Sequence, residues 1–341
     1  MIREYLLGLL MRSPRLQKRA IKRLAKNRMQ TRSQTAKELL RRDAITVVLS
    51  GTGTPIPSER AQASVALFVN GQFLLFDCGH RAMRSMEIHD LPLGQLDAVF
   101  LTHYHSDHFA DLGEVINRSW IFGRRHILPV YGPPGVVDVV TGFAKAYHLD
   151  NDYRTAHHGE AIMPSASAPA RAHEFTYDES GAPVLVYEQD GVIVKAFAVN
   201  HFPAKPAVGF RIEYKGKVVV ISGDTIVVPP LLEQSKNADL LVCDVMNKEI
   251  VGLMESALRE LGNHSNAKIM SDIPDYHMDV HEVGQLAQKN GIKHLALTHL
   301  VPTVTAKAQV RAFFEEPVAQ HYAGKLTVGE DGTRIVIKLD K

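Results

Sequence analysis

Four side chains that can bind metal ions stand within six residues, in the segment His103-Tyr-His-Ser-Asp-His108. Imidazole nitrogens and carboxylate oxygens are ligands that Zn²⁺, Mn²⁺ and iron accept. In an extended segment, residues two positions apart point to the same side, so His103 and His105 can hold one ion. Asp107 and His108 follow where the chain must turn, and they can face a second ion beside the first. The spacing therefore predicts a site for two metal ions.

Apolar strands must position this cluster, because Leu96-Asp-Ala-Val-Phe-Leu-Thr102 runs straight into His103. Runs of β-branched and apolar residues predict further strands at 44–50, 64–69, 73–76, 127–131, 192–199, 207–214, 217–222, 239–245 and 293–298. Helices are expected at 81–88, 136–147 and 280–290. Asn70-Gly71 is the dipeptide most typical of a tight hairpin. Two halves of this make-up predict an α/β fold, an αββα sandwich with its ligands at the strand ends.

The His-x-His-x-Asp-His segment resembles the signature of the metallo-β-lactamase superfamily, and other motifs follow in the family's order. Phe-Asp77-Cys-Gly is similar to the motif whose acid supports the histidine loop, and Asn-His201-Phe-Pro to the motif with the third histidine. Ser-Gly-Asp224-Thr and Thr-His299-Leu resemble the motifs of a bridging carboxylate and of a last ligand. The resemblance covers about residues 44–300 and implies the metallo-β-lactamase fold.

The resemblance also implies a division of the ligands between two divalent ions. One ion would be held by His103, His105 and His201, the other by Asp107, His108 and His299, with Asp224 between them. Zinc is the expected metal, with manganese or iron as alternatives. Two such ions share a water, lower its pKa and bind the oxygens of a reacting ester. Asp107 would orient this water or take its proton.

His277 is the expected proton donor to the leaving group. It stands 22 residues before His299, a spacing that resembles the His-Ser-Thr motif of ribonuclease Z. In that branch the histidine is paired with a glutamate; here Asp244 takes the corresponding position, so the predicted pair departs from the pattern. A carboxylate held against the imidazole would keep it cationic, as an acid requires. His281 is a nearby rival.

Two branches of the superfamily carry this histidine motif, the alkyl/arylsulfatase-like group and ribonuclease Z. Gly51-Thr-Gly-Thr-Pro and Tyr131-Gly-Pro-Pro-Gly look closer to the first group. Only 22 residues separate His201 from Asp224, too few for the long tRNA-binding arm of ribonuclease Z. The expected function is therefore hydrolysis of phosphodiester or sulfate ester bonds in small anionic aryl or alkyl substrates. The alternatives are a ribonuclease Z-type tRNA 3′ endonuclease, a lactonase and a non-catalytic metal-binding scaffold.

Charge divides the 341 residues into a basic arm and an acidic body. Residues 1–42 hold thirteen basic and two acidic side chains, whereas the remaining 299 hold 26 basic and 35 acidic ones. We expect a helical arm at 1–43, broken near Ser13-Pro14, before a catalytic domain at 44–341. Three uses of the arm stay open: packing on the body or on a partner subunit of a dimer, binding an anionic membrane surface, and binding nucleic acid.

The polar segment 150–182 is long for a plain connection, so an insertion or a lid over the site is expected there. From such a lid, Arg154, His157 and His158 would contact the substrate.

Two features of the sequence bear on where the protein is located. No run of 18 apolar residues occurs, and the two cysteines, Cys78 and Cys243, stand apart in strand-like segments. A cytoplasmic protein is expected, with membrane association only through the arm.

Overall fold

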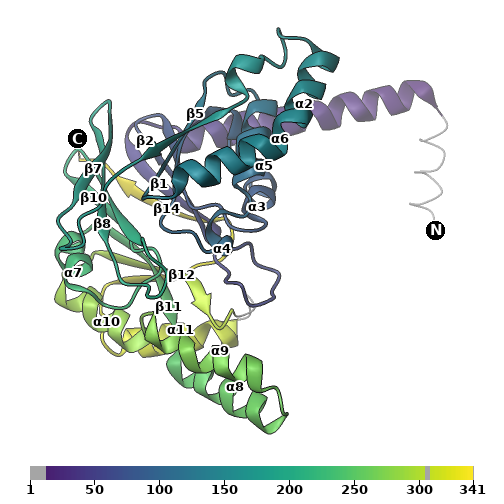
Figure 1. Cartoon of the computed structure of the whole chain (residues 1–341). Coiled ribbons are helices and arrows are strands. Elements are labelled where there is room, and N and C mark those ends of the chain that lie inside the picture. Colours follow the sequence, from purple (N-terminus) through teal and green to yellow (C-terminus); the bar gives the residue numbers. More distant parts are fainter. Residues whose placement is uncertain (1–12, 304–307, 341) are drawn as a thin grey trace.

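The computed structural model describes residues 13–303 and 308–340. Within these residues, two seven-stranded sheets face each other and helices cover their outer sides (Figure 1). In each half, strands that follow one another directly come first, and strands that alternate with helices come after them. This is the predicted αββα sandwich, and the prediction of fold class is confirmed.

The first sheet has the strand order β14-β1-β2-β3-β4-β5-β6. Its strands are β1 (Ala44–Gly51), β2 (Ser64–Val69), β3 (Gln72–Phe76), β4 (Leu96–Phe100), β5 (Leu128–Gly132), β6 (Ala170–Glu174) and β14 (Thr333–Lys338). β2 and β3 form the expected hairpin, with both Asn70 and Gly71 at positive φ. From β3 to β6 the strands are parallel, so helices must return the chain between them.

The second sheet has the order β13-β12-β11-β10-β9-β8-β7. Its strands are β7 (Val184–Gln189), β8 (Val192–Ala198), β9 (Val208–Tyr214), β10 (Lys217–Ile221), β11 (Leu240–Met246), β12 (His294–Val301) and β13 (Lys325–Val328). The strands β7 to β10 are antiparallel neighbours, and β10 to β13 are parallel. The carboxyl ends of β10, β11 and β12 therefore meet at one edge of this sheet.

The main core lies between the sheets. Phe76 and Phe100 of the first sheet contact Phe210 of the second, with ring centroids 5.3 and 5.7 Å apart. Two further apolar clusters lie on the outer faces, one under the helices of each half. Because β1, β2, β3, β11 and β12 are buried on both faces, their sequences are mostly apolar and do not alternate with polar residues.

Helices form the two outer layers. The first half contributes α3 (Ala82–Ile88), η1 (Leu93–Gln95), α4 (Ser106–Phe109), α5 (Leu112–Ile121), α6 (Val136–His158) and η2 (Ser165–Ser167). The second half contributes α7 (Pro229–Ser235), α8 (Lys248–Glu260), α9 (His264–Asp272), η3 (Ile273–Asp275), α10 (Val280–Lys289) and α11 (Ala308–Ala319). The helix α6 continues eleven residues beyond the predicted end, and the pair α8 and α9 was not predicted.

The helix α2 (Pro14–Leu39) projects from the body (Figure 1). It begins at Pro14, where a proline suits the first helical turn, and the predicted residues before Ser13 lie outside the described part of the chain. Only its last turns pack on the body, where Thr35 and Leu39 are buried and Arg32 pairs with Asp90 at 3.3 Å.

Both cysteines, Cys78 and Cys243, are buried and unpaired. Among residues 13–303 and 308–340, we find no helix with the length and apolar character needed to cross a bilayer.

Candidate metal centre and active site

The end of β4 delivers the histidine segment to the edge of the first sheet. Beyond Phe100 the chain bends at Thr102 and continues to His105, which is extended, and α4 then begins, so Asp107 and His108 lie on its first turn. This is the predicted arrangement, an extended pair followed by a turn. All four side chains face one space at the carboxyl ends of the strands.

Three histidines form the first ligand group. His103 Nε2 and His201 Nε2 each lie 3.1 Å from His105 Nδ1. His201 follows β8 of the second sheet, so the group joins the two halves of the fold. The ligand atoms of these three side chains lie within 4.8 Å of one another.

The second group combines one carboxylate and two histidines. His299 Nε2 lies 3.1 Å from Asp107 Oδ2, and His108 Nε2 lies 3.6 Å from the same oxygen. His299 has a positive φ of 45° inside β12, beside an irregularity in the pairing with β11. A non-glycine residue rarely adopts this conformation, and such strain gathers at functional sites. Here the bulge turns the imidazole toward Asp107.

Asp224 lies between the two groups. It follows β10 through Gly223, which has a φ of 62°. Its Oδ2 is 3.1 Å from His108 Nε2, 3.3 Å from His299 Nε2 and 3.8 Å from His201 Nε2. One carboxylate therefore faces ligands of both groups, which is the geometry expected of a bridging ligand.

Hydrogen bonds behind the ligands fix which ring nitrogens face the centre. His108 Nδ1 donates to Asp77 Oδ2 at 2.8 Å, and Asp77 is itself held by the backbone and hydroxyl of Thr102. His201 Nδ1 donates to the carbonyl oxygen of Tyr276 at 3.1 Å. With Nδ1 engaged in these bonds, Nε2 is the nitrogen of each ring that faces the shared space and can bind a cation. Several lone pairs and carboxylates that converge on one point fit a bound cation.

The charges of the site also fit cations. Burial lowers the pKa of His103 well below its usual value and that of His201 to about 4, so both are neutral ligands at pH 7. Burial would lower the pKa of His108 too, but the carboxylates of Asp224, Asp107 and Asp77 outweigh it and raise the pKa well above its usual value. The site thus has excess negative potential, which divalent ions would neutralise.

His277 and Asp244 form the predicted pair. His277 Nδ1 lies 2.7 Å from Asp244 Oδ2, and both side chains are buried. The His277 ring is 5.2 Å from the rings of His201 and His299, centroid to centroid. The rival, His281, is exposed on α10 and contacts His321 instead. The geometry brings His277, and not His281, to the metal-ligand cluster.

A pocket of about 280 Å³ opens over the cluster. Its floor is made of ligands, and its outer wall is apolar: Ile56, Ile269, Ile273, Tyr276 and Val301. Ile269 lies on α9 and Ile273 on η3, two helices that were not predicted, and Tyr276 directly follows η3. The available signal was Asn263, whose side chain caps the start of α9.

The segment 150–182 does not line this pocket among the described residues. Residues 150–158 finish α6, and 170–174 form the edge strand β6. Arg154 pairs with Asp150 at 2.6 Å on α6, and His157 and His158 end that helix. The structure therefore does not bring these three side chains to the cluster, because the helix continues where a loop was expected.

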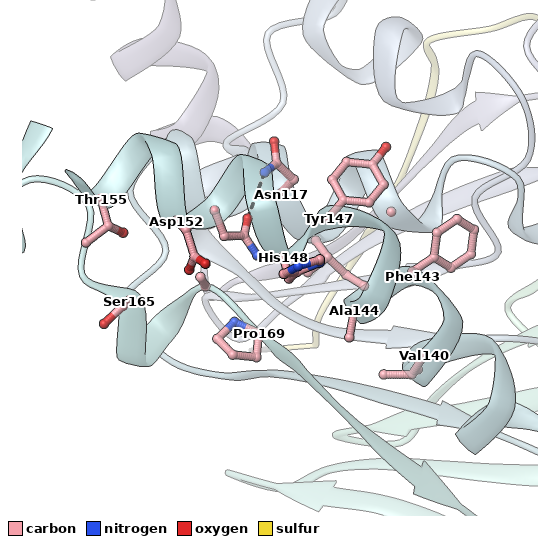
Figure 2. Close-up of a pocket in the computed structure, with 14 residues that line it drawn as sticks. Asn117, Val140, Phe143, Ala144, Tyr147, His148, Asp152, Thr155, Ser165 and Pro169 are labelled. Atoms are coloured by element: carbon pink, nitrogen blue, oxygen red, sulfur yellow. Dashed lines mark hydrogen bonds between the residues drawn. The ribbon is translucent and has the colours of Figure 1, made fainter. Parts of the chain in front are cut away.

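A second cavity, of about 220 Å³, lies between α5, α6 and the η2 turn (Figure 2). Phe143, Tyr147 and Pro169 line it, and Asn117 donates to Asp150 and Asn151 at its rim. It contains none of the candidate ligands.

Comparisons with known proteins agree with the fold. Residues 73–300 match the family described as "Beta-lactamase superfamily domain". A curated relative, "Ribonuclease Z" of Mycobacterium marinum, is 35% identical over 299 residues, 86% of this chain and 99% of the relative. "Ribonuclease Z" of Mycobacterium bovis is 34% identical over 297 residues, 85% and 98% of the two chains.

Solved structures give the same fold. The metallo-beta-lactamase fold protein YhfI from Bacillus subtilis has a TM-score of 0.60 at 20% identity and covers 86% of this chain and 100% of its own. The short form of human tRNase Z has a TM-score of 0.60 at 21% identity, covering 87% and 100%. At these identities the structural matches support the fold alone.

Proposed function

Because this chain belongs to the metallo-β-lactamase superfamily, in its ribonuclease Z-like branch, we propose that it is a metal-dependent endonuclease that removes 3′ extensions from precursor tRNA. The observation that carries the proposal is the match to curated ribonucleases Z over almost their entire length. The candidate metal ligands and the His277–Asp244 pair also support it, because they are the groups that metal-dependent hydrolysis of a phosphodiester needs.

The sequence-based expectation of small aryl or alkyl esters as substrates is wrong, because the relatives over nearly the whole chain are ribonucleases Z. The glycine motifs behind that expectation serve packing. A Cβ at Gly132 would lie 2.9 Å from Val136, and one at Gly51 would lie 1.8 Å from the carbonyl of Gln62. These glycines allow close approach of the backbone, which explains their presence without reference to a substrate.

We place two divalent ions in the site, most readily zinc, with manganese or iron as alternatives. Bound there, the ions would supply a shared water that ionises near neutral pH and would neutralise the oxygens of the scissile phosphate. His103, His105 and His201 would hold one ion, and Asp107, His108 and His299 the other. Asp224 faces both groups and would bridge them.

The protein's own groups would then manage the protons. Asp107 belongs to the second ligand group and lines the pocket, where its carboxylate orients the attacking water. His277 faces the pocket from the other side and donates a proton to the leaving ribose oxygen. Asp244 accepts from His277 Nδ1, which stabilises the charged imidazole and directs Nε2 into the pocket.

The test uses a precursor tRNA with a 3′ trailer, the purified chain and its His105→Ala variant, with zinc or manganese added. The wild type should release one trailer fragment at a defined position, and the variant should be slower by at least about 100-fold. Bis-p-nitrophenyl phosphate serves as a parallel substrate that needs no RNA recognition. Hydrolysis of this ester by a wild type that leaves every precursor tRNA intact would refute the proposed function.

A further inference from the structure

The projecting part of α2 is a row of cations. Residues 14–31 extend about 27 Å at 1.5 Å per residue and are exposed at every position except Gln17. Seven of these side chains are basic and none is acidic: Arg15, Lys18, Arg19, Lys22, Arg23, Lys26 and Arg28. Most of them gather on one side of the helix, since the first six recur at intervals of three and four positions.

This charge pattern lowers the stability of the helix. Arg15, Arg19 and Arg23 form one row of like charges four residues apart, and Lys18, Lys22 and Lys26 form another. Like charges at this spacing destabilise a helix. Within residues 13–303 and 308–340, none of the seven forms an ion pair, in contrast to Arg32 of the same helix. A helix without packing is marginal in water, so an external polyanion would stabilise this one.

The composition favours a nucleic acid over a lipid surface as that polyanion. A membrane-bound helix needs a continuous apolar face, usually with Trp, Phe or Leu. The side of α2 that carries Leu16, Ile21 and Leu24 is interrupted by Asn27 and Thr31, and residues 13–40 contain no aromatic side chain. Regularly spaced cations without such a face match the phosphates of a nucleic acid backbone.

The place of α2 in the fold requires a long ligand. Arg32 meets Asp90 and Phe122, which lie near the beginning of β4 and the end of α5. His103 lies beyond the opposite end of β4, so at least about 17 Å of strand separates the helix from the metal site. A small ester cannot contact both places at once, whereas a folded RNA can.

The body offers little else that could hold RNA. The connection between β9 and β10 is a two-residue turn, Lys215-Gly216, and the chain after residue 42 carries more acidic than basic residues. We propose that α2 is the arm that binds the phosphate backbone of precursor tRNA at a distance from the cleaved bond. The inference rests on the proposed function and adds the surface that recognises the substrate.

The test replaces Arg19, Lys22, Arg23 and Lys26 together with Gln, which removes four charges and keeps helix propensity. The matched control changes four other exposed cations to Gln: Lys145, Arg171, Lys289 and Lys325. For cleavage of precursor tRNA at 0.15 M salt, the arm variant should raise KM at least about ten-fold, and the control should not. The slope of log KM against log salt should become shallower by about 3. Hydrolysis of bis-p-nitrophenyl phosphate should stay unchanged in both.

A second measurement separates the failure of this inference from failure of the proposed function. Binding of a fluorescent precursor tRNA, followed by anisotropy without cleavage, should weaken in the arm variant alone. Equal KM values and equal tRNA binding in the two variants would overturn the inference, even if the wild type cleaves tRNA. The inference would also be overturned if the arm variant kept tRNA binding but lost binding to phosphatidylglycerol vesicles. The same holds if it kept tRNA binding but lost self-association in sedimentation. If the wild type binds tRNA through α2 but never cuts it, only the proposed function fails.

Discussion

The pair of His277 and Asp244 yields the sharpest prediction about chemistry. In Asp244→Asn the carboxylate that accepts from His277 Nδ1 at 2.7 Å becomes a neutral amide in a fully enclosed position. A hydrogen bond to a charged group contributes about 1.5–3 kcal/mol. Because 1.36 kcal/mol corresponds to a factor of ten in rate, kcat for precursor tRNA should fall about 10- to 150-fold.

The leaving group distinguishes a role in proton donation from general damage. The ribose oxygen needs a proton as it leaves, whereas p-nitrophenolate departs as a stable anion. Asp244→Asn should therefore lose activity on tRNA and keep most of its activity on bis-p-nitrophenyl phosphate, and Asp244→Glu should recover part of the tRNA activity. Both rates are measured at saturating substrate and metal, together with the thermal unfolding midpoint.

Asp97→Asn is a suitable control, because Asp97 is a part-buried acid that accepts from the Phe73 amide near the start of β4, at the end of the strand opposite to the histidine segment. It should leave both activities unchanged. Equal losses of Asp244→Asn on the two substrates, or no loss on tRNA, would refute the role of His277 as the proton donor.

Three further predictions concern the ligand support, the core and the pH dependence of stability. Asp77→Asn removes the carboxylate behind His108 and should weaken metal affinity about 10- to 100-fold in competition with a chelating dye, whereas unchanged affinity would contradict the assigned support. Phe210→Ala empties the centre of the inter-sheet core and should lower the free energy of unfolding by about 3–5 kcal/mol in urea; a loss below 1 kcal/mol would argue against this packing. Burial lowers the pKa of His294 to about 4. Between pH 6.5 and 4, His294 is therefore protonated in the unfolded chain but neutral in the folded protein. Stability should fall as the pH drops from 6.5 toward 4, because protonation favours the unfolded state. His294→Gln should reduce that fall in the metal-free protein by about 1–2 kcal/mol, and an equally steep fall in the variant would contradict it.

The segment from His103 to His108 could be predicted from the sequence, because its conformation depends on residues that are close together in the chain. The strand before His103 and the spacing to His108 fix an extended pair and a turn without any distant contact. His277 and Asp244 came from motif resemblance, and their 2.7 Å contact shows that the shorter carboxylate still reaches the imidazole. The hydrogen bond from His201 to the backbone carbonyl of Tyr276 could not be predicted, since nothing in the sequence indicates that these two residues meet.

The rest depended on packing between distant segments. Part of the pocket wall comes from α9, whose Ile269 lines the same pocket as Ile56 only because the chain folds back from the second half. The lid was misplaced because a polar stretch with His157 and His158 has no apolar stripe, yet α6 continues through it as an exposed helix. The substrate was mistaken because a missing arm between His201 and Asp224 was weighed as evidence against tRNA.

Seven side chains from both halves of the fold converge on the space that we propose for two cations. Anomalous X-ray scattering at the zinc edge, from crystals grown with zinc, tests it most directly. We expect two peaks about 3.5–4 Å apart, one among His103, His105 and His201 and the other beside His299, with Asp224 between them. A single peak, or zinc bound away from these residues, would contradict it.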